Sequence, residues 1–201
     1  MRRLGILLSG RGSNFLAIAA SIAAGRLDAE IAVVISNRAD VSGIAAARDS
    51  GFNAVVLASK GLDREIYDRQ LVELLRTNRV DLVCLAGYMR ILSGYFIREF
   101  PYRILNIHPS LLPAFPGLDA QHQALQHGVK FSGCSVHFVD EGVDSGPIIA
   151  QSVVPILDDD TVETLSARIL EQEHRVYTEA IALVLSGKFR IEGRRVLASI
   201  R

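Results

Sequence analysis

An amide and an imidazole stand two residues apart in the segment Asn106-Ile107-His108-Pro109. The apolar run from Ile104 to Ile107 predicts a short buried strand, and residues two apart on a strand project from the same face. An amide N–H can stabilise the oxyanion formed when a nucleophile adds to a carbonyl, and an imidazole can move a proton or supply positive charge. Taken alone, the pair fits a structural histidine beside a strand-end asparagine better.

An acidic loop further along the chain could supply a partner for this imidazole. It carries Asp140, Glu141 and Asp144. A carboxylate beside His108 would orient the ring and favour the imidazolium. The residues alone do not choose among the three acids, and a solvated acidic turn is the alternative.

Two buried positions could face the same cleft. Ser135 and His137 share one face of a predicted strand, whereas the other face is apolar. Glu173 falls within the apolar stripe of a long predicted helix, where a carboxylate is costly unless it is paired. Its partner could be a ligand group or a structural arginine.

A glycine-rich turn, Ser9-Gly10-Arg11-Gly12-Ser13-Asn14, joins the first predicted strand to the first predicted helix. Backbone N–H groups and a helix N-terminus attract an anion there, and Ser13 and Asn14 add side-chain donors. The turn lacks the Gly-Lys-Ser/Thr of a Walker A loop, and Phe15 replaces the third glycine of a dinucleotide fingerprint. It therefore favours a single phosphate, with a plain tight turn capped by Asn14 as the alternative.

The elements that position these residues alternate along the chain. Apolar runs of strand length begin at Leu4, Ile31, Ala54, Leu82 and Ile104, and helical periods lie between the first four. One predicted helix is capped by Asp63, with Ile66 on its inner stripe, and a long helix near the C-terminus begins with an Asp160/Glu163 capping box. We therefore expect one α/β domain over residues 1–201: a doubly wound, mostly parallel central sheet with helices on both faces and an antiparallel C-terminal edge.

Composition excludes several classes of protein. Lys plus Arg equals Asp plus Glu at 22 each, so the basic surplus typical of a nucleic-acid binder is absent. No apolar run approaches a membrane span, and the two cysteines suit buried free thiols. The histidine spacing matches no helical zinc pair, so we expect no metal. The chain is predicted to be cytoplasmic, without nucleic-acid or membrane partners, and a monomer or homodimer.

The segment Asn106-Ile107-His108-Pro109-Ser110-Leu111-Leu112-Pro113 resembles the signature of folate-dependent formyltransferases. Gly12-Ser13-Asn14, Met89-Arg90-Ile91-Leu92 and Asp144-Ser145-Gly146-Pro147 extend the resemblance over essentially the whole chain. It is strongest to the members that act on N1-(5-phosphoribosyl)glycinamide. The implied reaction transfers a formyl group from the cosubstrate 10-formyltetrahydrofolate to the amine of that phosphorylated small molecule in purine synthesis.

The resemblance also implies roles for residues. Asn106, His108 and Asp144 would be the catalytic set. The substrate would be bound by Gly12, Ser13, Asn14 and Glu173. The folate would be bound by Arg64, Met89, Arg90, Ile91, Leu92, Val139, Asp140, Glu141, Gly142 and Val143.

Two positions depart from the pattern, and three other functions compete. Asp119 stands where many members have a histidine, and Leu170 stands where a polar substrate contact is sometimes found. A formyltetrahydrofolate hydrolase would carry an N-terminal regulatory domain, for which a first strand at Leu4 leaves no room, and an initiator-tRNA formyltransferase would carry a further C-terminal domain. A non-catalytic nucleotide-binding module, with Arg38 reading a 2′-phosphate, is the third alternative.

Overall fold

The computed structural model describes residues 1–199. The chain forms two compact units, Met1–Leu105 and Asn106–Arg201. The boundary falls inside one strand, β5 (Ile104–His108), so each unit contains part of that strand. The single domain that we expected over residues 1–201 stays a prediction.

The first unit contains the strands β3, β2, β1 and β4 in that spatial order, with the first two residues of β5 next to β4. Strands β2 and β4 both pair in parallel with β1, and β3 pairs in parallel with β2. From Leu4 to Leu8 every residue of β1 is buried, as the continuous apolar run predicted. The strand bounds are β1 (Arg2–Leu8), β2 (Ala29–Ser36), β3 (Ala54–Val56) and β4 (Leu82–Leu85).

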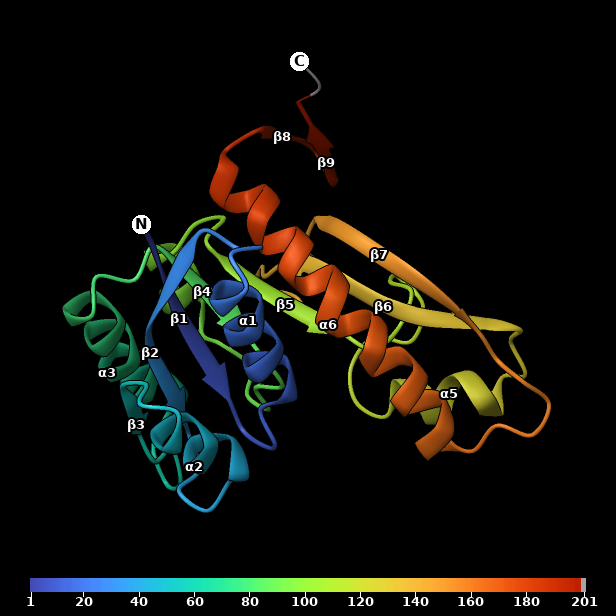
Figure 1. Cartoon of the computed structure of the whole chain (residues 1–201), viewed down its shortest axis with the longest axis horizontal. Coiled ribbons are helices and arrows are strands. Elements are labelled where there is room, and N and C mark those ends of the chain that lie inside the picture. Colours follow the sequence, from blue (N-terminus) through green and yellow to red (C-terminus); the bar gives the residue numbers. More distant parts are fainter. Residues whose placement is uncertain (200–201) are drawn as a thin grey trace. The chain divides into compact units, whose positions relative to one another are not determined.

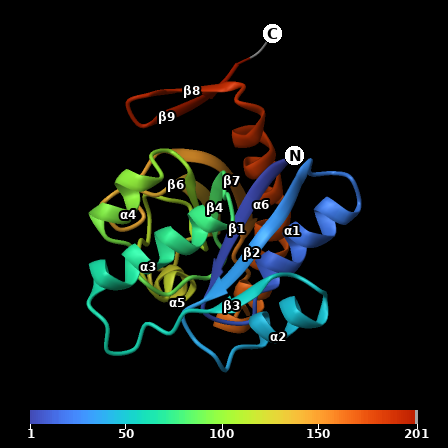
Figure 2. The same ribbon diagram turned by 90° about the vertical axis from the view of Figure 1, so that its left-hand side faces the viewer.

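Helices α1 and α3 lie on opposite faces of β1 and β2 (Figure 2). The Asp63 carboxylate caps α3 by accepting from the N–H groups of Glu65 and Ile66, as predicted. The prediction for Ile66 itself was wrong, because its side chain is 54% exposed and Tyr67 is buried in its place. The sequence also gave no sign of the short helix α4. The helix bounds are α1 (Ser13–Ala23), α2 (Ser42–Asp49), α3 (Arg64–Thr77) and α4 (Gly94–Glu99).

The second unit contains the strand order β5-β6-β7-β9-β8. Strand β6 (Phe131–Phe138) runs antiparallel to β7 (Ile148–Pro155), and β8 (Phe189–Glu192) forms an antiparallel hairpin with β9 (Arg195–Ala198). Helix α6 (Val162–Ser186) runs along β6 and β7 and covers one face of both strands (Figure 1). Helix α5 (Ala120–Gln126) follows the proline-rich loop.

The N-terminus of α6 differs from the prediction in one detail. The capping box is formed by Thr161 and Thr164, not by Asp160 and Glu163. Asp160 is engaged elsewhere, because both of its oxygens accept from the guanidinium of Arg168 at 2.7 and 2.9 Å. Within residues 1–199, no helix is both long and apolar enough to cross a membrane.

Candidate active site

Strand β5 places an amide and an imidazole on one face near its carboxyl end. Asn106 is half-buried, and the intervening Ile107 is buried. His108 is 4% exposed. The two side chains therefore project from the same face of the strand, as their two-residue spacing predicted. Both of them contact the same carboxylate.

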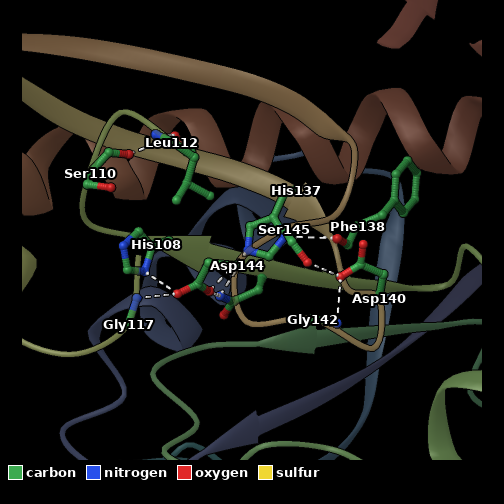
Figure 3. A network of polar contacts seen from close by, with 12 residues as sticks. His108, Ser110, Leu112, Gly117, His137, Phe138, Asp140, Gly142, Asp144 and Ser145 are labelled. Carbon is green, nitrogen blue, oxygen red and sulfur yellow. Dashed lines mark hydrogen bonds and ion pairs between the residues drawn. The ribbon is translucent and has the colours of Figure 1, made fainter. Parts of the chain in front are cut away.

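Asp144 is that carboxylate (Figure 3). Its Oδ2 lies 3.2 Å from His108 Nδ1, and its Oδ1 lies 3.3 Å from Asn106 Nδ2. Asp144 adopts φ 49°, a left-handed conformation that aspartate tolerates better than most residues. The structure thus brings together the three residues predicted as the catalytic set.

His137 on β6 is a fourth member, which the sequence suggested only through the strand period. Its Nε2 lies 3.2 Å from Asn106 Nδ2 and 3.5 Å from Asp144 Oδ1. Its Nδ1 donates to the carbonyl oxygen of Phe138 at 2.8 Å, which fixes the ring. Ser135, on the same face of β6, instead binds the loop that follows β5.

Backbone groups of the loop after β5 complete the network. His108 Nε2 donates to the carbonyl oxygen of Phe115 at 2.8 Å, and the Gly117 N–H donates to Asp144 Oδ2 at 2.8 Å. Both nitrogens of His108 therefore face acceptors, a carbonyl on one side and a carboxylate on the other. These two contacts hold the ring in one orientation.

The Asp144 carboxylate is held ionised by its neighbours. Burial raises its pKa, but the interactions with His137, with the Gly117 N–H and with His108 outweigh burial. The net pKa of Asp144 is lower than its ordinary value. A carboxylate that stays ionised at neutral pH is the partner that an imidazolium needs.

The structure distinguishes Asp144 from the other acids of its loop. Asp140 Oδ1 accepts from the Gly142 N–H at 3.1 Å and from Ser145 Oγ at 2.6 Å, so it shapes the loop itself (Figure 3). Glu141 is exposed. Of the three candidates that the sequence left open, Asp144 is the one whose carboxylate contacts His108.

The amide hydrogens of Asn106 both point at groups within the second unit. One faces His137 Nε2 at 3.2 Å, and the other faces Asp144 Oδ1 at 3.3 Å. The contact with Asp144 is longer than an ordinary N–H···O hydrogen bond. An incoming oxyanion could therefore replace it at small cost.

The glycine-rich turn belongs to the first unit. Gly12 is the N-cap of α1 with φ 76°, so the alternative in which Asn14 caps the helix is wrong. A Cβ on Gly12 would meet the Cα of Gly43 at 2.9 Å, at the start of α2. Ser13 begins α1, and Asn14 is buried within its first turn. The turn thus needs glycine for both its conformation and its space.

The predicted folate-binding residues of the first unit differ in exposure. Met89 and Ile91 are 69% and 55% exposed, whereas Leu92 is buried. The Arg90 guanidinium lies over the ring of Tyr67, 4.6 Å from its centroid. Arg64 is exposed at the first position of α3.

Residue Ser9 links the glycine-rich turn to the segment that begins at Met89. Its Oγ accepts from the Met89 N–H at 2.8 Å and donates to Asn37 Oδ1 at 2.6 Å. The hydroxyl therefore ties together the carboxyl ends of β1, β2 and β4.

Glu173 is buried on α6, as its place in the apolar stripe predicted. It lies near enough to Cys134 to affect that thiol. Burial, reinforced by the negative charge of Glu173, raises the pKa of Cys134 to about 12. Cys134 is accordingly an inert thiol of the core.

Within residues 1–199, no group of three or more His, Cys, Asp and Glu side chains is arranged to hold a metal ion. The two histidines of the polar network share a single carboxylate and are hydrogen-bonded to backbone carbonyls through their other nitrogens.

Comparison with known proteins identifies the family whose sequences and structures resemble this chain. Residues 2–181 match the family described as "Formyl transferase". The phosphoribosylglycinamide formyltransferase of Escherichia coli (strain K12) is 40% identical over 187 residues, which cover 92% of this chain and 88% of that protein. The crystal structure of glycinamide ribonucleotide transformylase 1 from Symbiobacterium toebii superposes with a TM-score of 0.96 at 55% identity, covering 98% of this chain and 94% of that chain.

A larger relative contains a similar segment. The trifunctional purine biosynthetic protein adenosine-3 of Drosophila pseudoobscura pseudoobscura is 50% identical over 192 residues. These cover 94% of this chain but only 14% of that protein.

The chain belongs to the formyl transferase family. This membership confirms the resemblance that the motifs around Asn106 and Asp144 indicated. The close structural match also confirms the α/β fold class with a mostly parallel sheet and an antiparallel C-terminal edge.

Proposed function

We propose that this chain transfers the formyl group of 10-formyltetrahydrofolate to the amine of N1-(5-phosphoribosyl)glycinamide in purine synthesis. The observation that carries the proposal is the Asp144 carboxylate, which contacts Asn106 through one oxygen and His108 through the other. An amide and an imidazolium held on one carboxylate suit addition to a carbonyl followed by departure of an amine. The family and the named relatives support the choice of reaction.

In the proposed reaction, the glycinamide nitrogen attacks the formyl carbon and forms a new C–N bond. The carbonyl oxygen becomes an oxyanion, which the Asn106 amide stabilises by exchanging its 3.3 Å contact with Asp144. The bond from the formyl carbon to N10 of the folate then breaks. The attacking nitrogen loses a proton and N10 gains one.

His108 supplies positive charge beside the oxyanion and mediates this proton transfer. Asp144 holds the ring through Nδ1, and its lowered pKa keeps it ionised so that the imidazolium retains its counter-charge. Because His108 Nε2 donates to the Phe115 carbonyl in this arrangement, direct proton donation requires that contact to be exchanged. A positive charge on the ring, in contrast, would act on the oxyanion without any rearrangement.

The remaining roles are proposed from the resemblance and supported by local structure. Gly12, Ser13 and Asn14 would bind the substrate phosphate at the N-terminus of α1, and Glu173 would contact the same substrate. Met89 to Leu92 and Val139 to Val143, with Arg64, would bind the folate. The exposed side chains of Met89 and Ile91 are available for such a ligand.

Amine dependence separates transfer from its nearest rival, hydrolysis. The purified chain is mixed with 10-formyltetrahydrofolate, and folate absorbance is followed with and without phosphoribosylglycinamide. We expect deformylation only when the amine is present. Equal rates in both conditions would identify a hydrolase. Titration with NADP tests the nucleotide-binding module, which requires saturable binding that we do not expect.

The cellular setting completes the proposal. We expect a cytoplasmic enzyme that needs no metal and takes only small molecules as substrates. Size-exclusion chromatography with light scattering distinguishes the monomer from the homodimer.

A further inference from the structure

The loop between β5 and α5 supplies two backbone groups to the catalytic network. The Phe115 carbonyl accepts from His108, and the Gly117 N–H donates to Asp144. Both are backbone groups, so their positions depend on the contacts that fix the conformation of the loop. The contacts of that loop with β6 and β7 show what holds it.

Two side chains bind the beginning of the loop. Ser135 Oγ donates to the Ser110 carbonyl at 2.7 Å and accepts from the Leu112 N–H at 3.0 Å. Gln151 Nε2 donates to the Leu112 carbonyl at 3.0 Å and to Ser135 Oγ at 2.8 Å. Ser135 and Gln151 are register partners on β6 and β7, so the two strands present them side by side.

Two hydrogen bonds within the loop then link its beginning to the residues next to the catalytic groups. Ser110 Oγ donates to the Ala114 carbonyl at 2.5 Å, and the Ala114 N–H donates to the Leu111 carbonyl at 3.0 Å. Phe115 follows immediately, with a left-handed φ of 52° that turns the chain. A shift at Leu112 would therefore move the Phe115 carbonyl relative to His108.

We propose that Ser135 and Gln151 are positioning residues for the formyl-transfer reaction. They fix the 110–117 loop, which in turn fixes the orientation of the His108 ring through the Phe115 carbonyl. This inference rests on the proposed function, although the geometry that it describes does not. Ser135 is completely buried and forms three hydrogen bonds, more than a serine needs merely to be accommodated in a core.

The test compares Ser135→Ala with a matched serine on the same strand. Ser132 is also buried, but its Oγ has no hydrogen-bond partner among the described residues. Ser132→Ala therefore removes a buried hydroxyl without touching the loop. We expect Ser135→Ala to lower kcat on the order of 10-fold, because small displacements of catalytic groups have large effects on rate. We expect Ser132→Ala to stay within twofold of wild type.

Two further readouts separate positioning from a loss of folding. Ser135→Thr, which keeps the hydroxyl, should recover most of kcat, and both KM values should change less than threefold in Ser135→Ala. If Ser135→Ala does not fold, Gln151→Leu replaces it, since Gln151 is exposed and its loss should also lower kcat. Equal kcat for wild type, Ser135→Ala and Gln151→Leu would overturn the proposal.

Nuclear magnetic resonance of the ring nitrogens tests the same geometry without any substrate. The His108 Nε2–H is bonded to the Phe115 carbonyl in a side chain that is 6% exposed, so its proton should exchange slowly and be observable. We expect this signal to be lost in Ser135→Ala and retained in Ser132→Ala. A chain without formyl transfer would overturn the proposed function, whereas an unchanged His108 signal in Ser135→Ala would overturn the positioning role of Ser135 and Gln151.

Discussion

Replacing Asp144 with asparagine tests how the catalytic network is held together. The carboxylate has two oxygens, and each serves two partners. Asparagine offers one carbonyl oxygen in nearly the same shape, so one pair of donors loses its acceptor. The His108 imidazolium also loses its counter-charge.

The size of the effect follows from burial. The Asp144 side chain is only 13% exposed, so water screens its contacts weakly. A hydrogen bond to a charged group contributes up to about 3 kcal/mol. At about 1.4 kcal/mol for each factor of ten in rate, Asp144→Asn should lower kcat by about 10²-fold.

The assay measures kcat and both KM values at pH 7 with 10-formyltetrahydrofolate and phosphoribosylglycinamide. Asp158→Asn is the control, because that carboxylate side chain is 98% exposed and its change should alter kcat less than twofold. Urea unfolding of both variants verifies that they are folded. A kcat for Asp144→Asn within threefold of wild type would refute the reasoning.

Three other variants test separate parts of the account. Asn106→Ala should lower turnover on the order of 10²-fold or more, as loss of one oxyanion donor does, and a loss under threefold would remove that role. Gly12→Ala should cost at least about 1–2 kcal/mol in unfolding free energy from its left-handed φ, and more than Gly25→Ala, because its Cβ would also meet the Gly43 Cα. Gly12→Ala should also raise the KM for phosphoribosylglycinamide, which Gly25→Ala should leave unchanged. Burial lowers the pKa of His174 in the folded chain. Below pH 6.5 the unfolded chain therefore binds a proton that the folded chain does not, and the unfolding free energy should fall as the pH drops below that value. His174→Gln should reduce that slope in urea titrations at pH 7 and pH 5; equal slopes would contradict the assignment.

Residue patterns predicted most of the elements, because each depends on a local rule. The continuous apolar run from Leu4 to Leu8 indicated a strand buried on both faces, and Asp63 indicated the start of α3. The two-residue spacing of Asn106 and His108 indicated a shared face. Such signals are carried by the type and order of residues, so a single sequence contains them.

Other features depend on contacts that no local pattern encodes. Asp140 and Asp144 look equivalent along the chain, and only the path of the loop sends one to Ser145 and the other to His108. Backbone groups such as the Phe115 carbonyl and the Gly117 N–H leave no mark in residue type.

The cap of α6 is a second feature that the sequence alone did not predict correctly. Two overlapping patterns, Asp160 with Glu163 and Thr161 with Thr164, are one residue apart. In the structure Thr161 caps the helix, and the Asp160 carboxylate pairs with Arg168.

The most direct test follows the formyl carbon itself. The chain is incubated with phosphoribosylglycinamide and 10-formyltetrahydrofolate labelled with carbon-13 in the formyl group, and the products are observed by carbon nuclear magnetic resonance. We predict that the label appears as a formamide on the glycinamide nitrogen, and that Asn106→Ala and Asp144→Asn slow its appearance. Label that accumulates as free formate at the same rate with or without the amine would contradict the account.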